Sequence, residues 1–136
     1  MIRIDLDSPV PLEEQLRSAL REAIARGEVA AGQELPSSRQ LGGDLGIHFN
    51  TVARAYRRLR DEGLLTIGRG RGVYVRARDE DAADAPEVRS RVEEKLRDVV
   101  TEATLGGWSL ERLEEIFREH LDEWRGASAA RKETGA

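Results

Sequence analysis

The stretch Leu35–Gly63 reads LPSSRQLGGDLGIHFNTVARAYRRLRDEG and predicts two short helices joined by a tight turn. Ser37 and Gln40 have the capping-box spacing, in which each side chain accepts a hydrogen bond from the other residue's backbone N–H. Gly46 stands where the first helix must end, because glycine readily adopts the left-handed conformation that terminates helices. The second helix is expected over residues 49–62. The rest of the chain is organised around this pair.

The second of these helices has an apolar face and a polar face. Its apolar residues recur at the i, i+3, i+4, i+7 spacing of an amphipathic helix and are Val52, Ala55, Tyr56 and Leu59. Its outward face carries Asn50, Thr51, Arg54, Arg57 and Arg58. Hydrogen-bonding side chains near a helix start and arginines further along suit contacts with base edges and phosphates. The pattern favours a helix that meets DNA, with Tyr56 in the core.

The segment before this stretch predicts one more helix. A Ser-Pro-Val-Pro run ends a short extended arm, and Pro11 suits the first turn of a helix, where its missing N–H costs nothing. Apolar residues then follow at helical spacing from Leu12 to Ile24, and Gly27 ends the run. We expect this helix to pack across the two that follow, and a short strand at residues 33–35.

A glycine-rich turn follows the helical pair. Residues 64–67 and 73–75 favour β-structure and are expected to pair as a hairpin wing. The turn between them places Arg69 and Arg71 on either side of Gly70. Glycine lets a backbone approach a phosphate closely, and the arginines can reach a phosphate or a minor groove. The alternative is a flexible hairpin tip with solvated arginines.

Together these segments resemble the GntR family of bacterial winged helix-turn-helix regulators. The resemblance rests on Leu-Pro-Ser-Ser-Arg-x-Leu, Leu-Gly-Ile, Asn-Thr-Val-x-x-Ala-Tyr-x-x-Leu, Glu-Gly-Leu-Leu and the glycine-rich wing, and it covers Ser8–Val75. The short chain and the Asn-Thr-Val run look most like the YtrA-type branch. The resemblance implies DNA contacts at Ser37, Ser38, Arg39, His48, Phe49, Asn50, Thr51, Arg54, Arg58, Arg69, Gly70 and Arg71. The alternative for each arginine is a solvated surface side chain.

Some positions depart from the family pattern. Phe49 stands where many members place a base-reading arginine, so it either touches a thymine methyl or packs on the turn. His48 stands where Ser or Thr often caps the recognition helix, and it either touches a phosphate or fills the cap. Gly42 and Gly43 replace helix formers, and each glycine destabilises the helix by about 1 kcal/mol relative to alanine. Gly42 is interpreted as permitting close helix packing, and Gly43 has no explanation in the sequence.

The C-terminal segment predicts two amphipathic helices. Residues 1–78 form the expected winged helix-turn-helix domain, residues 79–85 an acidic linker, residues 86–125 a helical hairpin and residues 126–136 a disordered tail. One hairpin cannot cover both apolar stripes, so we expect a homodimer that buries Val88, Val92, Leu96, Val99, Leu110, Leu113, Phe117, Leu121 and Trp124. The alternative is that the helices fold back onto their own winged helix. The expected fold class is mainly α, or α+β.

Charge is unevenly distributed along the chain. The net charge is −4, yet residues 1–78 hold 13 Arg and 10 Asp and Glu, a net charge of +3. Residues 79–136 hold 9 Lys and Arg and 16 Asp and Glu, a net charge of −7. DNA responds to the local field of the face that it meets, so the acidic total does not argue against DNA binding.

Composition excludes several classes of function. There is no Cys, which excludes thiolate zinc sites and cysteine nucleophiles, and the two histidines, His48 and His120, are isolated. The sequence therefore predicts no metal, no cofactor and no enzymatic activity. No apolar run approaches the ~20 residues that span a membrane, and no secretory signal opens the chain, so we expect a cytoplasmic protein.

The resemblance implies a dimeric regulator, a repressor, that binds double-stranded operator DNA. Its YtrA-type branch implies control of the protein's own operon, often with a membrane transporter, and names no effector. Two other functions remain open from the residues alone. One is a protein-interaction adaptor built on a winged helix, and the other is an architectural protein that binds DNA without sequence preference.

Overall fold

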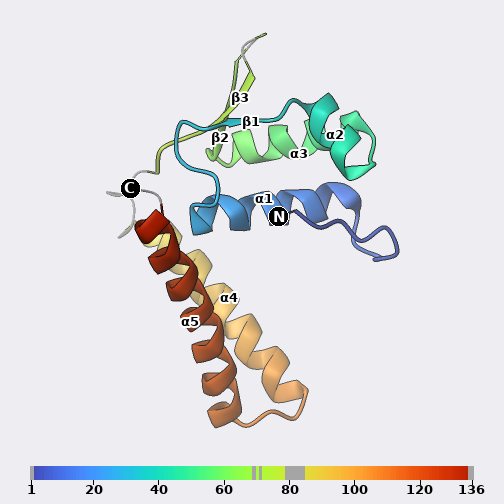
Figure 1. Cartoon of the computed structure of the whole chain (residues 1–136). Coiled ribbons are helices and arrows are strands. Elements are labelled where there is room, and N and C mark those ends of the chain that lie inside the picture. The colour runs from blue at the N-terminus through green and yellow to red at the C-terminus, as the bar shows by residue number, and fades with distance from the viewer. Residues whose placement is uncertain (1, 69, 71, 79–84, 135–136) are drawn as a thin grey trace. The chain divides into compact units, whose positions relative to one another are not determined.

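The computed structural model describes residues 2–68, 70, 72–78 and 85–134, with side chains up to residue 126. The chain forms two compact units, residues 1–78 and residues 79–136. The elements are α1 (Leu12–Arg26), β1 (Glu34–Leu35), α2 (Ser38–Leu45), α3 (Phe49–Asp61), β2 (Leu65–Gly68), β3 (Gly72–Val75), α4 (Pro86–Leu105) and α5 (Leu110–Thr134) (Figure 1). The expected fold class, mainly α with a β-hairpin wing and two C-terminal helices, is confirmed.

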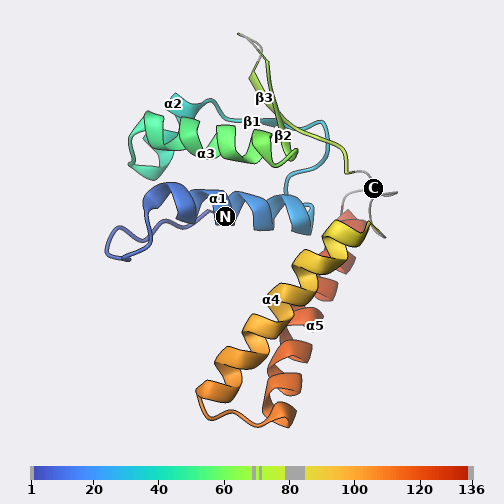
Figure 2. The same ribbon diagram turned by 180° about the vertical axis from the view of Figure 1, so that it is seen from behind.

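The core of the first unit lies between α1, α3 and the sheet. Helices α1 and α3 run side by side in both views (Figures 1 and 2). Helix α1 contributes one buried residue per turn, because every fourth side chain returns to the same face. The buried residues are Leu16, Leu20, Ile24, Leu35, Leu41, Val52, Ala55, Tyr56, Leu59, Leu65, Val73 and Val75. The predicted inward stripe of α3 is thus confirmed, including Tyr56.

The wing is a three-stranded antiparallel sheet with strand order β1-β3-β2. Leu65 pairs with Val75 and Ile67 pairs with Val73, so the register places apolar residues opposite one another. Side chains alternate along β3, where Val73 and Val75 are buried and Tyr74 is exposed. One face of the wing therefore closes the core, and the other faces solvent.

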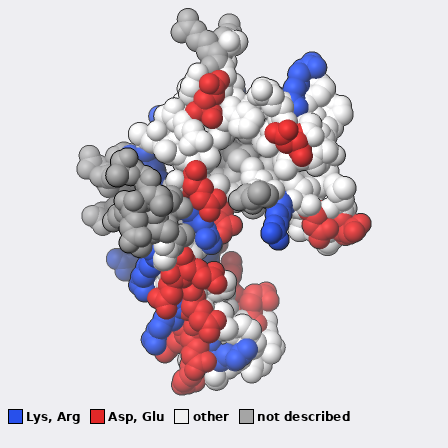
Figure 3. All heavy atoms as spheres, viewed as in Figure 1, with Lys and Arg blue, Asp and Glu red and all other residues white. Residues whose placement is uncertain are grey.

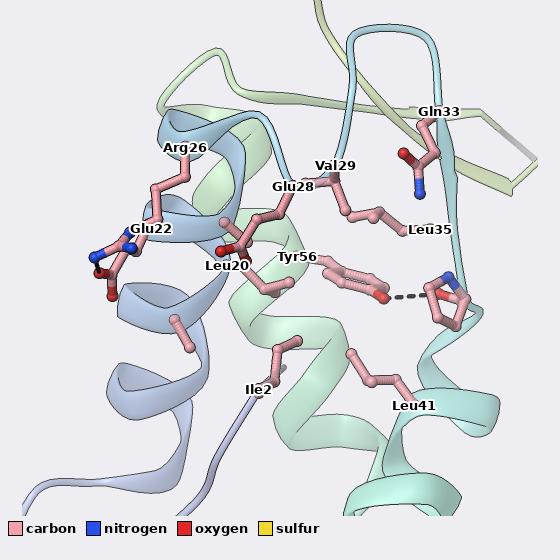
Figure 4. A pocket seen from close by; sticks show the side chains of 13 residues that line it. Ile2, Leu20, Glu22, Arg26, Glu28, Val29, Gln33, Leu35, Leu41 and Tyr56 are labelled. Carbon is pink, nitrogen blue, oxygen red and sulfur yellow. Dashed lines mark hydrogen bonds and ion pairs between the residues drawn. The ribbon is translucent and has the colours of Figure 1, made fainter. Parts of the chain in front are cut away.

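Tyr56 anchors the segment that leads into α2. Its hydroxyl donates a 2.7 Å hydrogen bond to the Pro36 carbonyl, and its ring is buried (Figure 4). Desolvation by burial raises the pKa of Tyr56 from 10.0 to about 12. A pocket of about 560 Å³ lies beside the ring, with Leu20 and Leu41 in its wall and Ile2 of the N-terminal arm at its edge.

Helices α2 and α3 meet at a close backbone contact. Ser37 caps α2 through the predicted capping box with Gln40, and Gly46 ends it in the left-handed conformation. A Cβ on Gly42 would lie 2.9 Å from the Ile47 carbonyl oxygen and 3.2 Å from the Phe49 Cα, whereas one on Gly43 would meet nothing within 4 Å. The interpretation of Gly42 as a packing residue is confirmed, and nothing in the structure explains Gly43.

The second unit is a helical hairpin, in which α4 and α5 lie side by side in both views. Pro86 opens α4, and Ser109 accepts a 3.1 Å hydrogen bond from the Arg112 N–H, as expected of a cap. No residue of α4 is buried. In the parts of the chain that the structure describes, no helix is both long and apolar enough to cross a bilayer.

The structure corrects the predicted end of the second unit. Helix α5 continues through Thr134, so residues 126–134 are helical rather than a disordered tail. Alanine, arginine, lysine and glutamate dominate this segment, and all four have high helix propensity, so the helix continues without an apolar stripe. Residues 135–136 and the expected linker residues 79–84 lie outside the described residues.

We predict that Tyr56→Phe lowers the free energy of unfolding at pH 8 by about 1 kcal/mol, because the variant loses the hydrogen bond from the Tyr56 hydroxyl to the Pro36 carbonyl. The raised pKa disfavours ionisation in the folded state, so the wild type loses stability as the pH rises from 10 to 12. The difference between wild type and variant should therefore shrink at pH 11. Urea denaturation at both pH values measures it, and the exposed Tyr74→Phe is the control. A difference that stays constant with pH contradicts this account.

The two adjacent glycines of α2 should respond oppositely to alanine. Gly42→Ala should destabilise the fold by about 1–3 kcal/mol, because the new Cβ collides with backbone atoms that cannot move aside. Gly43→Ala should stabilise it by about 1 kcal/mol, because a helical site with open space gains from lower backbone entropy in the unfolded chain. Thermal unfolding of both variants tests the pair, and equal shifts would disprove the contact at Gly42.

Candidate nucleic-acid interface

The start of α3 is fixed by a histidine cap. His48 has extended backbone dihedrals, and its Nδ1 accepts a 3.0 Å hydrogen bond from the Asn50 N–H. The capping role of His48 is confirmed, and a phosphate contact from Nε2 stays a prediction. With Nδ1 accepting, Nε2 is left as the donor in the neutral ring. The helix start also carries the positive end of the helix dipole, which favours an anion such as a phosphate.

An aromatic and cationic cluster covers this end of the helix. The guanidinium carbon of Arg39, from α2, lies 4.7 Å from the centroid of the Phe49 ring. The His48 ring stacks on the same Phe49, with centroids 4.7 Å apart and planes inclined by 24°. All three side chains are exposed. Phe49 therefore packs on the turn, and it keeps enough exposed surface to touch a base.

Two arginines of α3 share one carboxylate from α1. Glu13 Oε2 lies 3.4 Å from Arg54 Nε, and Glu13 Oε1 lies 3.6 Å from Arg58 Nη1. Arg57 makes no ion pair with any side chain that the structure describes. Sequence reasoning missed Glu13, because nothing near it in the chain indicates which helix it faces. A carboxylate beside these arginines lowers the local positive charge and limits their rotamers.

Comparison with known proteins identifies the family. Residues 12–75 match the family described as bacterial regulatory proteins, gntR family. The HTH-type transcriptional repressor YtrA of Bacillus subtilis (strain 168) is 32% identical over 119 residues, which cover 88% of this chain and 91% of that protein. The chain belongs to the GntR family. It is a DNA-binding transcriptional regulator and not an enzyme.

Two solved structures share the fold of this GntR-family chain. One is YtrA from Sulfolobus acidocaldarius, a GntR-family transcription factor, with 33% identity and a TM-score of 0.56 over 71% of this chain and 97% of that chain. The other is a transcriptional antiterminator from Listeria monocytogenes EGD-e, with 21% identity and a TM-score of 0.79 over 91% and 92%. At that identity the second likeness shows the fold alone.

The structure brings most of the expected DNA-binding residues of this GntR-family protein onto α2 and the first turns of α3. Arg39, His48, Phe49, Asn50, Arg54 and Arg58 are exposed, whereas Ser38 and Thr51 are half-buried. Ser37 is exposed, and its hydroxyl caps α2. On the wing, Gly70 is exposed, and Arg69 and Arg71 lie outside the described residues. Contact of each residue with DNA stays a prediction.

The residues expected at a dimer interface lie along the α4 and α5 hairpin. Val88 and Leu113 are half-buried, and the exposed ones are Val92, Leu96, Val99, Leu110, Phe117, Leu121 and Trp124. A groove of about 790 Å³ runs between the two helices, with Trp108 and Ile116 in its wall. Acidic side chains crowd the outside of this hairpin (Figure 3). Among the described residues no cluster of His, Asp and Glu could hold a metal ion.

We predict that Glu13→Gln raises affinity for unrelated duplex DNA by up to about fivefold, because it frees Arg54 and Arg58 and removes a charge that repels phosphate. Glu14→Gln is the matched control, since Glu14 lies one residue on and pairs with Arg17 instead. Fluorescence anisotropy at several salt concentrations measures both variants. Equal affinities for wild type and Glu13→Gln would show that Glu13 does not compete with phosphate.

Proposed function

We propose that this GntR-family regulator is a dimeric repressor that binds a near-palindromic operator in the cytoplasm. The observation that carries the proposal is the exposed cluster at the start of α3, where Arg39, Phe49 and Asn50 lie beside the His48 cap. Polar and cationic side chains at the tip of a recognition helix are the groups that read base edges in the major groove. The likeness to a protein named as the transcriptional repressor YtrA supports repression.

Each part of the surface has a distinct role in this proposal. Arg39 and Asn50 contact base edges, because guanidinium and amide groups pair bidentately with guanine and adenine. Arg54 and Arg58 contact phosphates or bases after they leave Glu13. Ser37, Ser38, His48 and Thr51 contact the backbone, and Arg69, Gly70 and Arg71 of the wing reach a phosphate or the minor groove.

Dimerisation occurs through α4 and α5 in this proposal. Large apolar side chains along both helices remain exposed, which a second copy related by a two-fold axis buries. Two recognition helices then read half-sites about 10 base pairs apart, or a multiple of that spacing. The regulated genes are those of the protein's own operon, together with the genes of a membrane transporter. No effector is assigned.

The DNA-binding part is tested by a mobility shift of the full-length protein on the region upstream of its own gene, with unrelated competitor DNA. Arg54→Ala should weaken specific binding by about 1–3 kcal/mol if Arg54 makes a base contact. Arg60→Ala, which removes an exposed arginine from the last turn of the same helix, should have little effect. Equal binding to competitor DNA indicates an architectural protein, and no binding indicates an adaptor.

The dimer is tested by analytical ultracentrifugation at micromolar concentration. Val92→Glu with Phe117→Glu should convert the dimer to a folded monomer with weaker operator affinity, because each places a charge on an apolar face that pairs with the second copy. Leu105→Glu is the control, since Leu105 is more exposed (79%) but lies at the end of α4 beside the hairpin turn. A monomeric wild type would disprove this interface and the half-site spacing with it.

A further inference from the structure

We propose that the pocket beside Tyr56 is a small-molecule site for an amphipathic cation, a compact apolar body that carries one ammonium group. The pocket has a volume of about 560 Å³, which lies within the range of about 300–1,000 Å³ that small-molecule sites occupy. Bound there, the molecule acts as an effector of DNA binding. The effector role rests on the proposed operator binding, whereas the site itself does not.

The pocket is enclosed by α1, the segment that follows it, β1 and the N-terminal arm (Figure 4). Ala19 and Ala23 lie one turn apart on α1, so two small side chains line the pocket where larger ones would fill it. The arm is tied to α1 at Asp5, whose N–H donates a 2.9 Å hydrogen bond to Gln15 Oε1 and whose carbonyl accepts one of 3.0 Å from Gln15 Nε2. The walls of the pocket are thus held in place by the fold.

The inner wall of the pocket is apolar. It contains the side chains of Leu20, Leu35 and Leu41 and the ring of Tyr56, each at most 7% exposed. An apolar body placed against this wall removes its own surface and that of the wall from water, which favours association without directional bonds. The wall therefore accounts for the apolar part of the ligand.

Of the described polar groups at the rim, one carboxylate has no partner. Glu22 pairs with Arg26 at 2.9 Å, and Gln33 Oε1 accepts a 3.0 Å hydrogen bond from the Ala30 N–H. Among the side chains that the structure describes, none makes an ion pair or a hydrogen bond with the Glu28 carboxylate at the pocket (Figure 4). An ammonium group donates hydrogen bonds to a carboxylate and neutralises its charge. Glu28 therefore selects a cation.

The pocket also borders the two DNA-binding helices. Leu41 lies in α2 and Tyr56 in α3, and the Tyr56 hydroxyl donates its 2.7 Å hydrogen bond to the Pro36 carbonyl just before α2 begins. A ligand in contact with these residues favours the arrangement of α2 and α3 in which it fits best. Because coupling between two sites is reciprocal, the operator changes ligand affinity by the factor by which the ligand changes operator affinity.

Binding is tested by NMR titration of the isotopically labelled full-length protein with primary amines that differ in their apolar body: tryptamine, phenethylamine and isoamylamine. The matched alcohols, which are tryptophol, phenethyl alcohol and isoamyl alcohol, keep the body and lack the charge. At least one amine should shift the amide signals of Ala23 and Val29 with a dissociation constant of about 1 mM or below. That amine should bind at least about threefold more tightly than its alcohol.

Variants separate the charge from the space. Glu28→Gln should weaken amine binding about threefold and leave alcohol binding unchanged, because it removes the charge and keeps the shape. Glu34→Gln is the matched control, since Glu34 lies in β1 and does not line the pocket. Ala23→Leu should abolish binding of amines and alcohols by filling the space, whereas Ala25→Leu on the same helix should not, since Ala25 does not line the pocket. Circular dichroism checks that each variant is folded.

The effector role has its own measurement, operator affinity in a mobility shift with and without a saturating amine. The amine should change that affinity at least about fivefold in wild type and leave it unchanged in Ala23→Leu.

The outcomes distinguish the site from the effector role and from the proposed function. If no amine shifts the signals of the pocket residues, or if each amine binds no better than its alcohol, the cation site is overturned. Amine binding with unchanged operator affinity overturns the effector role and leaves the site intact. Failure of the protein to bind its operator overturns the proposed function and the effector role together, whereas the NMR titration still decides the site.

Discussion

The close approach of α2 to the start of α3 is the constraint on which the DNA-facing surface depends. Only a residue without a side chain fits at Gly42, because a Cβ there would lie 2.9 Å from the Ile47 carbonyl oxygen. The Ile47 N–H also donates a 3.0 Å hydrogen bond to the Gly42 carbonyl, which fixes the turn between the helices. Backbone packing thus brings Arg39 to the Phe49 ring, and the recognition surface inherits the rigidity of that contact.

Two carboxylates link α1 to the recognition helix, Glu13 from α1 and Glu62 from the end of α3. Glu62 lies 2.8 Å from Arg17, whose side chain is only 18% exposed, so this pair helps to fix the angle between the helices. Glu13 contacts Arg54 and Arg58 at longer distances, and both of these arginine side chains are about half exposed. Exposed ion pairs typically contribute about 0–1 kcal/mol, so Glu13 affects the field at the interface more than it affects stability.

The two units differ in how far they bury their apolar side chains. The first unit encloses a cluster of fully buried side chains between three helices and a sheet, and the ring of Tyr56 is among the largest of them. Helix α4 has no buried residue, and α5 leaves Phe117 and Trp124 exposed. A hairpin of two amphipathic helices has too few layers to enclose a core of its own. The first unit therefore buries its apolar side chains within itself, whereas the second leaves large apolar side chains exposed.

The sequence by itself determined the local structure of this protein. Capping spacing and glycines set the limits of α2 and the start of α5, and the apolar period of α3 identified its buried face, because these signals act between residues a few positions apart. The prediction ended α5 too early, because the apolar stripe stops at Trp124 whereas helix propensity carries the helix on to Thr134. Only the tertiary structure decided which side chains of different helices contact one another. Glu13 contacts Arg54, and Arg39 contacts Phe49, and in each case the two residues come from different helices. A helical period predicts the direction of a side chain but not the group that lies opposite it, so these contacts could not be predicted from the sequence.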